Sequence, residues 1–511
     1  MKAKKVILAV CAGTLAALAC VAERPDSVAY SVSAIGGGAT RQFNPYLLGS
    51  NNRGLTPMGG TALLDAGVSK DFDLGSRFSW EAGVEVAGGY SHKAPYQRFD
   101  AASGAWTTAE RGPAPIWLQQ LYASVKWRGV FISAGMRNRD PEIVDATLSS
   151  GDLVEGVNAR AIPQVRAGFV DFQNIPFTRG WVQIKGSLAY GKMAENSYLR
   201  DHYNYYSGHI ATGTLYTYKD IYFRSNPAKP LHVTIGVQSA GFFGGTTEWY
   251  TEGQLVRTAK NRQNFKAFCE MLIPKKGNAD GYVDGSHLGS WDFRATYRFR
   301  GAHELSGYFE WLWEDGSSMG RRNKWDGLWG LEYRRPGRHV IEGAVLEYID
   351  FRDQSGPMHW APGDHPGTTI TSEATGGDDY YNNSAFNAYA NLGMSLGTPF
   401  VVSPIYNTDG YLQFKHTRSR GFHAAARGSI ADRWQWRAAL SYAVAWGQGR
   451  FHYNEPRHNT SALAEVKWLQ PFNVSNLSAA AAVAFDAGSL RGNNFGAMLT
   501  LTYSGNITFS K

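Results

Sequence analysis

Catalytic motifs are nearly absent from this sequence of 511 residues. Residues 316–320 read Gly-Ser-Ser-Met-Gly and match the G-x-S-x-G motif of serine hydrolases by spelling. That motif needs a sharp turn from a strand into a helix, whereas this segment joins two runs with β-strand alternation. No H-E-x-x-H motif, paired C-x-x-C motif or phosphate-binding loop is present. The sequence therefore predicts no enzyme and no catalytic residue. A glycan or lipid hydrolase that uses Ser318 is the weakest alternative.

Acidic residues occur in the predicted loops, notably Asp280, Asp284, Asp378 and Asp379. Carboxylate oxygens of this kind suit Ca²⁺. These residues lack the spacing of an EF-hand loop, however, and solvated acidic side chains are common in turns. We therefore predict neither a metal nor a cofactor.

The predicted loops are also rich in aromatic residues, which lie among Asp, Glu, Asn and Arg. They are Trp249, Tyr250, Trp325, Trp329, Trp360, Tyr380 and Tyr381, with His287 beside a loop. Aromatic rings offer flat faces to the C–H surfaces of sugars, and binding sites combine apolar walls with a few placed polar groups. The pattern indicates a sugar-binding surface. The alternative is that these rings pack the loops together or belong to an aromatic girdle.

The elements between these loops alternate between apolar and polar residues, as β-strands with one apolar face do. From 495 to 509 every odd residue is apolar or glycine, while the even residues are mostly small and polar. This run is roughly twice as long as a usual globular strand. Similar alternation covers 78–90, 291–299, 305–313 and 433–447.

The run 433–447 separates two classes of β protein. Its apolar face begins with Trp434 and Trp436 and ends with Trp446. The last two are separated by about 33 Å along a strand, or about 25 Å across a membrane if the strand tilts by about 40°. This distance matches the apolar band of an outer-membrane barrel, and the three tryptophans would lie in its girdles. A soluble β-sandwich has no reason to place aromatic residues at both ends of an outward face.

Composition and charge agree with this interpretation. Charged residues make up 18% and aromatic residues 14%, with a mean hydropathy of −0.33. Beyond the N-terminus no run approaches the roughly 18 apolar residues of a membrane helix. A helical membrane protein, a disordered chain and a coiled coil are therefore excluded. The formal net charge of +8 is spread along the chain, so we predict no nucleic-acid partner.

Residues 1–22 are predicted to be a secretory signal peptide, because lysines precede an apolar stretch and small residues. Cleavage after Ala19 or after Ala22 fits equally well, and a lipid on Cys20 is a weaker alternative. Cleavage after Ala22 leaves Cys269 as the only cysteine, so no internal disulfide is expected. Residues 23–511 are predicted to form one all-β domain, a transmembrane antiparallel barrel of about 18 strands (roughly 16 to 20) with long extracellular loops.

The connections between the predicted strands alternate between short and long. Short turns are predicted at 128–129, 226–230, 300–303, 335–338 and 431–432, and long polar segments at 91–114, 138–160, 193–217, 241–287, 349–385 and 447–458. With the N-terminus on the periplasmic side, the long segments would be extracellular. The weakest predicted strands are 28–35 and 401–405.

Charged residues on the predicted inner faces are Glu81, Glu85, Lys126, Lys185, Arg294, Arg298, Glu310, Arg437, Glu465 and Lys467. If 291–299 and 305–313 form a hairpin, Arg294 and Arg298 share a wall with Glu310. We favour a cross-strand charge ladder over a polar path for permeation or ligand binding.

Seven segments, in this order, resemble the Wzi-type capsule assembly family in its Bacteroidetes branch. They are 148–154 (LSSGDLV), 158–166 (NARAIPQVR), 285–292 (GSHLGSWD), 314–317 (EDGS), 326–332 (DGLWGLE), 354–357 (QSGP) and 379–383 (DYYNN). Each is weak alone, but their order is specific, and the resemblance runs from about residue 45 to 450. One departure is that enterobacterial members carry a helical segment before the barrel, whereas this chain has the pattern of extended strands almost from its predicted mature start.

The resemblance implies an outer-membrane barrel of about eighteen strands that acts as a lectin, without catalysis, and helps to attach or organise capsular polysaccharide. The implied partners are surface polysaccharide and outer-membrane lipid. The polysaccharide contacts that we predict from these segments are Asn158, Arg160, His287, Asp315, Asp326, Trp329, Asp379 and Tyr380. The main alternative is a porin or transport channel with an open lumen.

Overall fold

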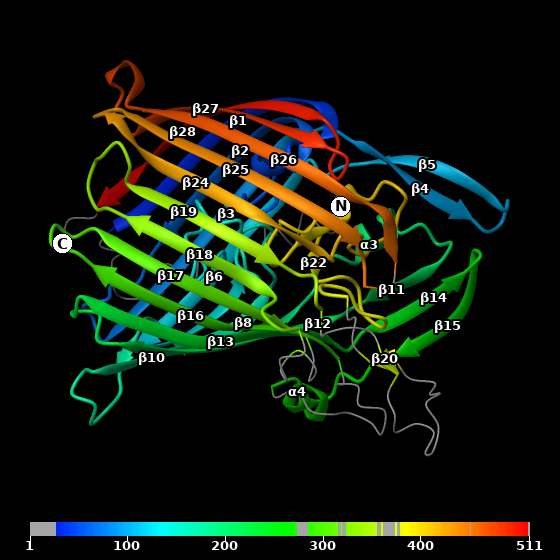
Figure 1. Ribbon diagram of the computed structural model, residues 1–511, viewed down its shortest axis with the longest axis horizontal. Coiled ribbons are helices and arrows are strands. Elements are labelled where there is room, and N and C mark those ends of the chain that lie inside the picture. Colours follow the sequence, from blue (N-terminus) through cyan, green and yellow to red (C-terminus); the bar gives the residue numbers. More distant parts are fainter. Residues whose placement is uncertain are drawn as a thin grey trace.

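The structure, a computed structural model, is a closed antiparallel β-barrel whose long connections gather at one end (Figure 1). It describes residues 27–272, 285–314, 318, 323–354, 359–360, 374–375, 379–449 and 451–508. Within these residues, eighteen strands form the wall, and the predicted fold class is confirmed. The predicted signal peptide lies outside the described residues.

The wall strands are β1 (Ser27–Phe43), β2 (Met58–Lys70), β3 (Phe78–Ser91), β6 (Ile116–Trp127), β7 (Val130–Met136), β8 (Gln164–Phe169) with its continuation β9 (Gln173–Asn174), β10 (Val182–Lys192), β12 (Leu215–Ser225), β13 (Leu231–Phe243), β16 (Ser286–Arg298), β17 (Glu304–Trp313), β18 (Gly327–Arg334), β19 (Gly343–Asp350), β24 (Ser419–Ala431), β25 (Trp434–Gly447), β26 (His452–Leu469), β27 (Leu477–Gly488) and β28 (Asn494–Thr508). β8 and β9 both pair with β10 and count as one interrupted strand.

Smaller elements lie in the connections. They are the β4 (Ala94–Asp100) and β5 (Ala105–Arg111) hairpin, β11 (Gly208–Thr212), β14 (Thr246–Thr251), β15 (Gln254–Lys260), β20 (His359–Trp360), β21 (Ala374–Thr375), β22 (Ala390–Asn391), β23 (Met394–Ser395), the helices α2 (Tyr46–Gly49), α3 (Asn196–His202) and α4 (Phe265–Leu272), and the 3-10 turns η1 (Pro404–Tyr406) and η2 (Pro471–Asn473). None of the described helices has the length and apolar character needed to cross a membrane.

The first and last strands close the barrel. β1 pairs with β28 from Ser27 opposite Thr508 to Ala39 opposite Gly496. Leu499 and Leu501 are exposed on the outer face of β28, whereas Thr502 points inward and its hydroxyl lies 2.9 Å from the hydroxyl of Ser33. The alternation that predicts this strand therefore separates an apolar outer face from a polar inner face.

The outer face of β25 carries the tryptophans of the predicted girdle. Trp434 is exposed and stacks on Trp468 of β26, with ring centroids 5.3 Å apart. Trp436 and Trp446 share its parity along the strand, as does the exposed Leu440. The three tryptophans therefore share one face of the strand, and the girdle that their spacing predicts stays a prediction.

The connections sort into two kinds, one at each end of the barrel (Figure 1). We call the two ends the short-turn end and the long-loop end. The short turns predicted at 128–129 and 226–230 join adjacent strands as expected. The predicted strand at 401–405 is wrong, because this segment lies in the connection between β19 and β24 and its last two residues begin η1. Its apolar side chains, such as Val401, pack inside the barrel instead of facing lipid.

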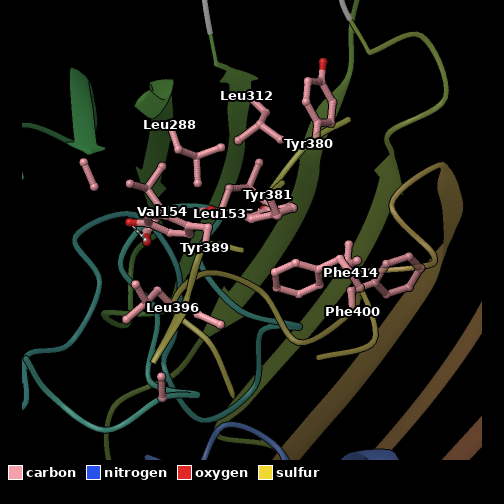
Figure 2. Packing of buried hydrophobic residues seen from close by; sticks show 14 of the residues in the cluster. Leu153, Val154, Leu288, Leu312, Tyr380, Tyr381, Tyr389, Leu396, Phe400 and Phe414 are labelled. Carbon is pink, nitrogen blue, oxygen red and sulfur yellow. Dashed lines mark hydrogen bonds between the residues drawn. The ribbon is translucent and has the colours of Figure 1, made fainter. Parts of the chain in front are cut away.

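Two long connections fold back from the long-loop end into the lumen, and we call them the plug. They are residues 137–163, between β7 and β8, and residues 379–418, which precede β24. Figure 2 shows plug residues Leu153, Val154, Tyr389, Leu396 and Phe400 packed with wall residues Leu288 and Leu312. A barrel of this size has a lumen that wall side chains alone do not fill. The plug therefore supplies the hydrophobic core.

Candidate functional site

Wall side chains hold the backbone of the first family-like segment inside the lumen. Glu347 accepts a hydrogen bond from the amide of Ser150 at 2.8 Å, and Glu310 accepts one from the amide of Leu153 at 3.0 Å. The hydroxyl of Tyr308 donates to the other oxygen of Glu347 at 2.5 Å. Two wall carboxylates thus satisfy plug amides that burial would otherwise leave unpaired.

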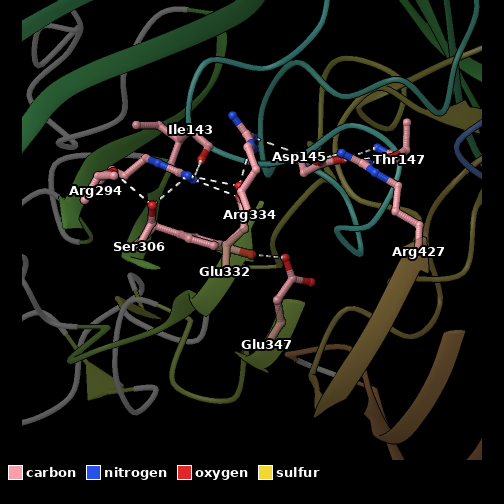
Figure 3. Close-up of polar contacts among 11 residues, drawn as sticks. Ile143, Asp145, Thr147, Arg294, Ser306, Glu332, Arg334, Glu347 and Arg427 are labelled. Atoms are coloured by element: carbon pink, nitrogen blue, oxygen red, sulfur yellow. Dashed lines mark hydrogen bonds and ion pairs between the residues drawn. The ribbon is translucent and has the colours of Figure 1, made fainter. Parts of the chain in front are cut away.

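A second set of charged contacts holds the plug nearer the short-turn end (Figure 3). Arg294 donates to the carbonyl of Ile143 at 2.6 Å and to both oxygens of Glu332 at 3.0 and 3.1 Å. Arg427 donates to both carboxylate oxygens of Asp145, each at 2.9 Å. Bidentate pairs of this kind fix orientation as well as distance, so the plug has a defined position.

The predicted charge ladder is present on the inner wall. Arg298 pairs with Glu304 at 2.8 Å, and Arg437 pairs with Glu465 at 3.1 Å. Glu310 departs from the prediction, because it accepts a hydrogen bond from the plug amide of Leu153 instead of pairing with an arginine. The inner charges therefore serve two purposes: they pair across strands and they anchor the plug.

Three predicted polysaccharide contacts lie in the plug or the wall. Asn158 is fully buried, where it accepts from the amide of Asn51 at 3.1 Å and donates to the carbonyl of Ser395 at 3.0 Å. It therefore bridges two loops. Arg160 places its guanidinium carbon 5.1 Å from the ring centre of Trp117. His287 is buried on β16.

Three more predicted contacts gather where β18 begins. Asp326 is buried and accepts from the amides of Asp353 and Gln354, the latter at 2.7 Å. Burial raises the pKa of Asp326 to about 7. Tyr380 is also fully buried, and the side chain of Asn323 donates to its hydroxyl at 3.0 Å. The adjacent Asp379 accepts from Asn382 and from Thr417. These side chains tie loops to one another.

The remaining two predicted contacts lie elsewhere. Trp329 is on the outer face of β18, partly exposed, with its ring stacked 3.8 Å from that of Phe309. Trp325 lies beside Trp329, and their ring centroids are 6.0 Å apart. This is the girdle-type placement that we weighed as the alternative. Asp315 lies outside the described residues.

A different group of aromatic residues forms a partly exposed surface at the long-loop end. We call Phe99, Trp106, Tyr205, Tyr206 and Tyr250 the aromatic platform. Phe99, Trp106 and Tyr206 lie with ring centroids 5.0 to 5.5 Å apart, and Tyr205 contacts Tyr250 at 5.4 Å. They come from the β4–β5 hairpin, the segment after α3 and β14, which Figure 1 shows at the same end.

The platform combines apolar faces with polar groups. Trp106 is 47% exposed. The guanidinium carbon of Arg98 lies 4.7 Å from the ring centre of Tyr205, and the hydroxyl of Tyr250 donates to Glu248 at 3.1 Å. Burial and the nearby Glu248 raise the pKa of Tyr250 to about 12. The phenol therefore stays neutral at pH 7 and can donate hydrogen bonds.

Sequence reasoning missed most of this platform. Only Tyr250 is among the loop aromatics that the pattern singles out. The segment Tyr203-Asn204-Tyr205-Tyr206 and the exposed Trp106 fall inside predicted long loops but outside the family-like segments. The density of tyrosine over 203–206 was the available signal.

Among the described residues, no group of three or more His, Cys, Asp or Glu side chains is arranged to hold a metal ion. Ser318, the serine of the hydrolase alternative, has only 3% of its surface exposed. A nucleophile that attacks a polymeric substrate has to be reached by that substrate, so this placement does not favour hydrolysis.

Comparison with known proteins finds similarity in structure but not in sequence. No protein-family model matches the chain, and no curated protein matches it. Among solved structures, the chain is similar to Wzi of Escherichia coli, described as an outer-membrane, carbohydrate-binding β-barrel involved in group 1 capsule assembly. The TM-score is 0.54 at 13% identity, and the match covers 100% of this chain and 89% of that one.

Two solved structures from Pseudomonas aeruginosa match as well. The chain is similar to OprD of Pseudomonas aeruginosa, with a TM-score of 0.44 at 8% identity over 94% of this chain and 96% of that one. It also matches OccK5 of the same organism, with a TM-score of 0.43 at 8% identity over 94% and 98% of the two chains. The likeness to the Escherichia coli protein, whose TM-score exceeds 0.5, agrees with the fold, a large β-barrel.

Proposed function

We propose that the protein lies in the outer membrane, binds a surface or capsular polysaccharide at its long-loop end, and helps to attach or assemble that polysaccharide without catalysing a reaction. We further propose that it belongs to the Wzi-type family that its seven ordered segments resemble. The observation that carries the proposal is the aromatic platform, which offers exposed ring faces beside charged side chains above a plugged lumen.

The platform has the chemistry of a glycan site. Trp106 and Tyr206 present ring surface to which sugar C–H groups can stack, and Arg98 lies at the same surface to meet hydroxyl or carboxylate groups. Rings are also low in conformational freedom, so they lose little entropy on binding. A polymer needs an open surface instead of a deep pocket, and the long-loop end provides one.

The plugged lumen favours polysaccharide binding over a porin function. Residues of 137–163 and 379–418 form a packed core with the wall, and wall charges hold this core on two levels. A porin needs a continuous water-filled path. If the protein is a porin instead, the purified chain will conduct ions in planar bilayers; our proposal expects no steady conductance.

The direct test is binding of capsular polysaccharide, purified from the strain that encodes the protein, to the detergent-solubilised chain. We expect the double variant Trp106→Ala/Tyr206→Ala to weaken binding about tenfold or more, because each lost ring contact contributes roughly 1 kcal/mol. The matched control is Trp181→Ala, since Trp181 is 58% exposed but lies at the short-turn end. Unchanged binding by the double variant would remove the platform from the site.

The residues predicted from the family-like segments belong in the same assay. Trp329→Ala alters only the outer wall, so we expect it to bind normally. Asp379→Asn alters a loop contact and reports whether this carboxylate touches sugar. In cells, deletion of the gene should release polysaccharide into the medium while total synthesis continues. Retention of cell-bound polysaccharide in the deletion strain would contradict the proposed attachment role.

A further inference from the structure

A small cavity between the plug and the wall is strongly basic. It has a volume of about 40 Å³, and its lining includes four arginines and one carboxylate: Arg53, Arg137, Arg139, Arg160 and Glu155. A single water needs about 10–15 Å³ of such space, so the cavity has room for a small ion or for one charged group of a larger molecule.

Three of these five charged groups are already paired. Arg53 forms an ion pair with Asp140 at 3.0 Å, and Arg137 pairs with Glu81. Glu155, the carboxylate of the lining, forms an ion pair with Arg166 at 2.7 Å. Within the described residues, no ion pair therefore accounts for the two remaining arginines.

Arg139 and Arg160 have few contacts of their own. Arg139 donates one long hydrogen bond, 3.4 Å, to the carbonyl of Arg137. Arg160 lies over the ring of Trp117, and its Nε is buried without a hydrogen-bond partner in the described part of the chain. Two guanidinium groups therefore share one cavity and have unused donors.

Both groups stay charged at neutral pH. Burial lowers the pKa of Arg139 to about 9 and that of Arg160 to about 10, with nearby Arg166 adding to the effect on Arg139. Both values remain above 7. Glu155 and Glu81 offset part of the desolvation of Arg139, but partly buried guanidinium donors without hydrogen-bond partners remain unfavourable. Guanidinium groups bind carboxylate and phosphate oxygens through two parallel hydrogen bonds.

The cavity connects to a larger one. Arg137, Asn138, Arg139 and Glu155 also line a cavity of about 350 Å³ that extends along the wall to Phe72, in the turn between β2 and β3. The larger cavity therefore extends from the basic cavity toward the short-turn end of the lumen, on the opposite side from the aromatic platform.

We propose that Arg139 and Arg160 form a binding site for one oxyanion group. The ligand is either a free inorganic oxyanion or the carboxylate of a uronic acid whose ring lies in the adjoining 350 Å³ cavity. This site is separate from the platform, and its existence does not depend on the polysaccharide-binding proposal.

The test is equilibrium dialysis of the full chain in detergent against radiolabelled phosphate, sulfate or glucuronate, with glucose as the neutral probe. We expect saturable binding of an anionic probe at one site per chain and no saturable binding of glucose. Tighter binding of glucuronate than of both inorganic ions would assign the site to an acidic sugar. Tighter binding of phosphate or sulfate would assign it to a free oxyanion.

Substitutions connect the binding to the two arginines. Arg139→Gln and Arg160→Gln should each weaken binding about tenfold or more, because charge-assisted hydrogen bonds are lost, while Arg139→Lys should retain part of it. The matched control is Arg298→Gln, which removes a paired arginine from the wall outside both cavities and should stay within about threefold of the native chain. No saturable anion binding, or equal affinity in all variants, would overturn the proposal.

Discussion

Removing the Asp145 carboxylate should loosen the plug. Asp145 is only 8% exposed and receives two hydrogen bonds of 2.9 Å from Arg427. A further arginine, Arg334, lies 3.8 Å away. In Asp145→Ala both arginines lose this partner. The plug segment 137–163 then loses its strongest charged contact on the short-turn side.

The expected size of this effect follows from the exposure of the pair. Removing one partner of a fully buried ion pair costs about 3–5 kcal/mol, whereas an exposed pair contributes about 0–1 kcal/mol. Arg427 is 32% exposed, so the pair falls between these limits, and we take about 2 kcal/mol. That energy raises the population of a detached plug about 30-fold. The hydrophobic contacts of the plug remain, so the barrel itself should still form.

Single-channel recording in planar bilayers measures this population directly. The native chain should be nearly silent, and Asp145→Ala should show brief openings about 30 times more often. Asp145→Asn, which retains hydrogen-bonding oxygen but no charge, should have a smaller effect. Glu304→Ala is the control, since it breaks the wall pair with Arg298 and leaves plug contacts intact. Equal opening frequencies in Asp145→Ala and Glu304→Ala would refute the idea that this ion pair holds the plug.

Three other perturbations have defined outcomes. Gly330→Ala should destabilise the barrel by about 2 kcal/mol in denaturant unfolding, because the new methyl carbon would lie 2.0 Å from the ring of Tyr308. In the control Gly307→Ala the new methyl carbon meets nothing within 4 Å, so its stability should be unchanged. Burial lowers the pKa of His202 to about 4, below its unfolded value of about 6.5. The contribution of His202 to stability is therefore complete above pH 6.5 and is lost as the pH falls toward 4, a loss of up to about 3 kcal/mol in the free energy of unfolding of the loops. Unfolding followed by tryptophan fluorescence should show this loss, and His202→Gln should remove the pH dependence. Asp326 has the opposite pH dependence, because its pKa is raised to about 7. The stability of its loop should fall by up to about 4 kcal/mol as the pH rises from 4 to 7. Hydrogen exchange at 352–354 should become faster over this range in the native chain but not in Asp326→Asn.

The barrel was predictable because each strand repeats the same physical requirement. Lipid outside and water or plug inside impose a period of two on β25 and β28, and this period is visible in one sequence. The failure at 401–405 has the same origin. Val401 is apolar because it packs in the plug core, and a short apolar run looks the same in a strand and in a buried loop.

The candidate site was harder to predict because its residues meet across long loops. The family-like segments predict Asn158 and Asp326 as polysaccharide contacts, and this stays a prediction; the contacts that the two side chains make in the structure hold loops together. Trp329 could not be placed, since a tryptophan at a strand end suits a girdle as well as a loop. Phe99 and Tyr206 come from different loops, and nothing local in either loop shows that their rings meet.

The plug and the aromatic platform are parts of one structure. The carbonyl of Thr408 accepts from the amide of Gln97 in β4 at 2.8 Å, and the carbonyl of Gly410 accepts from Asn204 at 2.9 Å. These two contacts join residues 379–418 directly to the hairpin and the segment that carry the platform. A loop surface that binds a polymer must keep its rings in place without a bound ligand, since ordering them on binding would weaken affinity. Backbone hydrogen bonds to a core fixed inside the lumen meet that requirement, and under the proposed function they give the filled barrel a role in holding the platform.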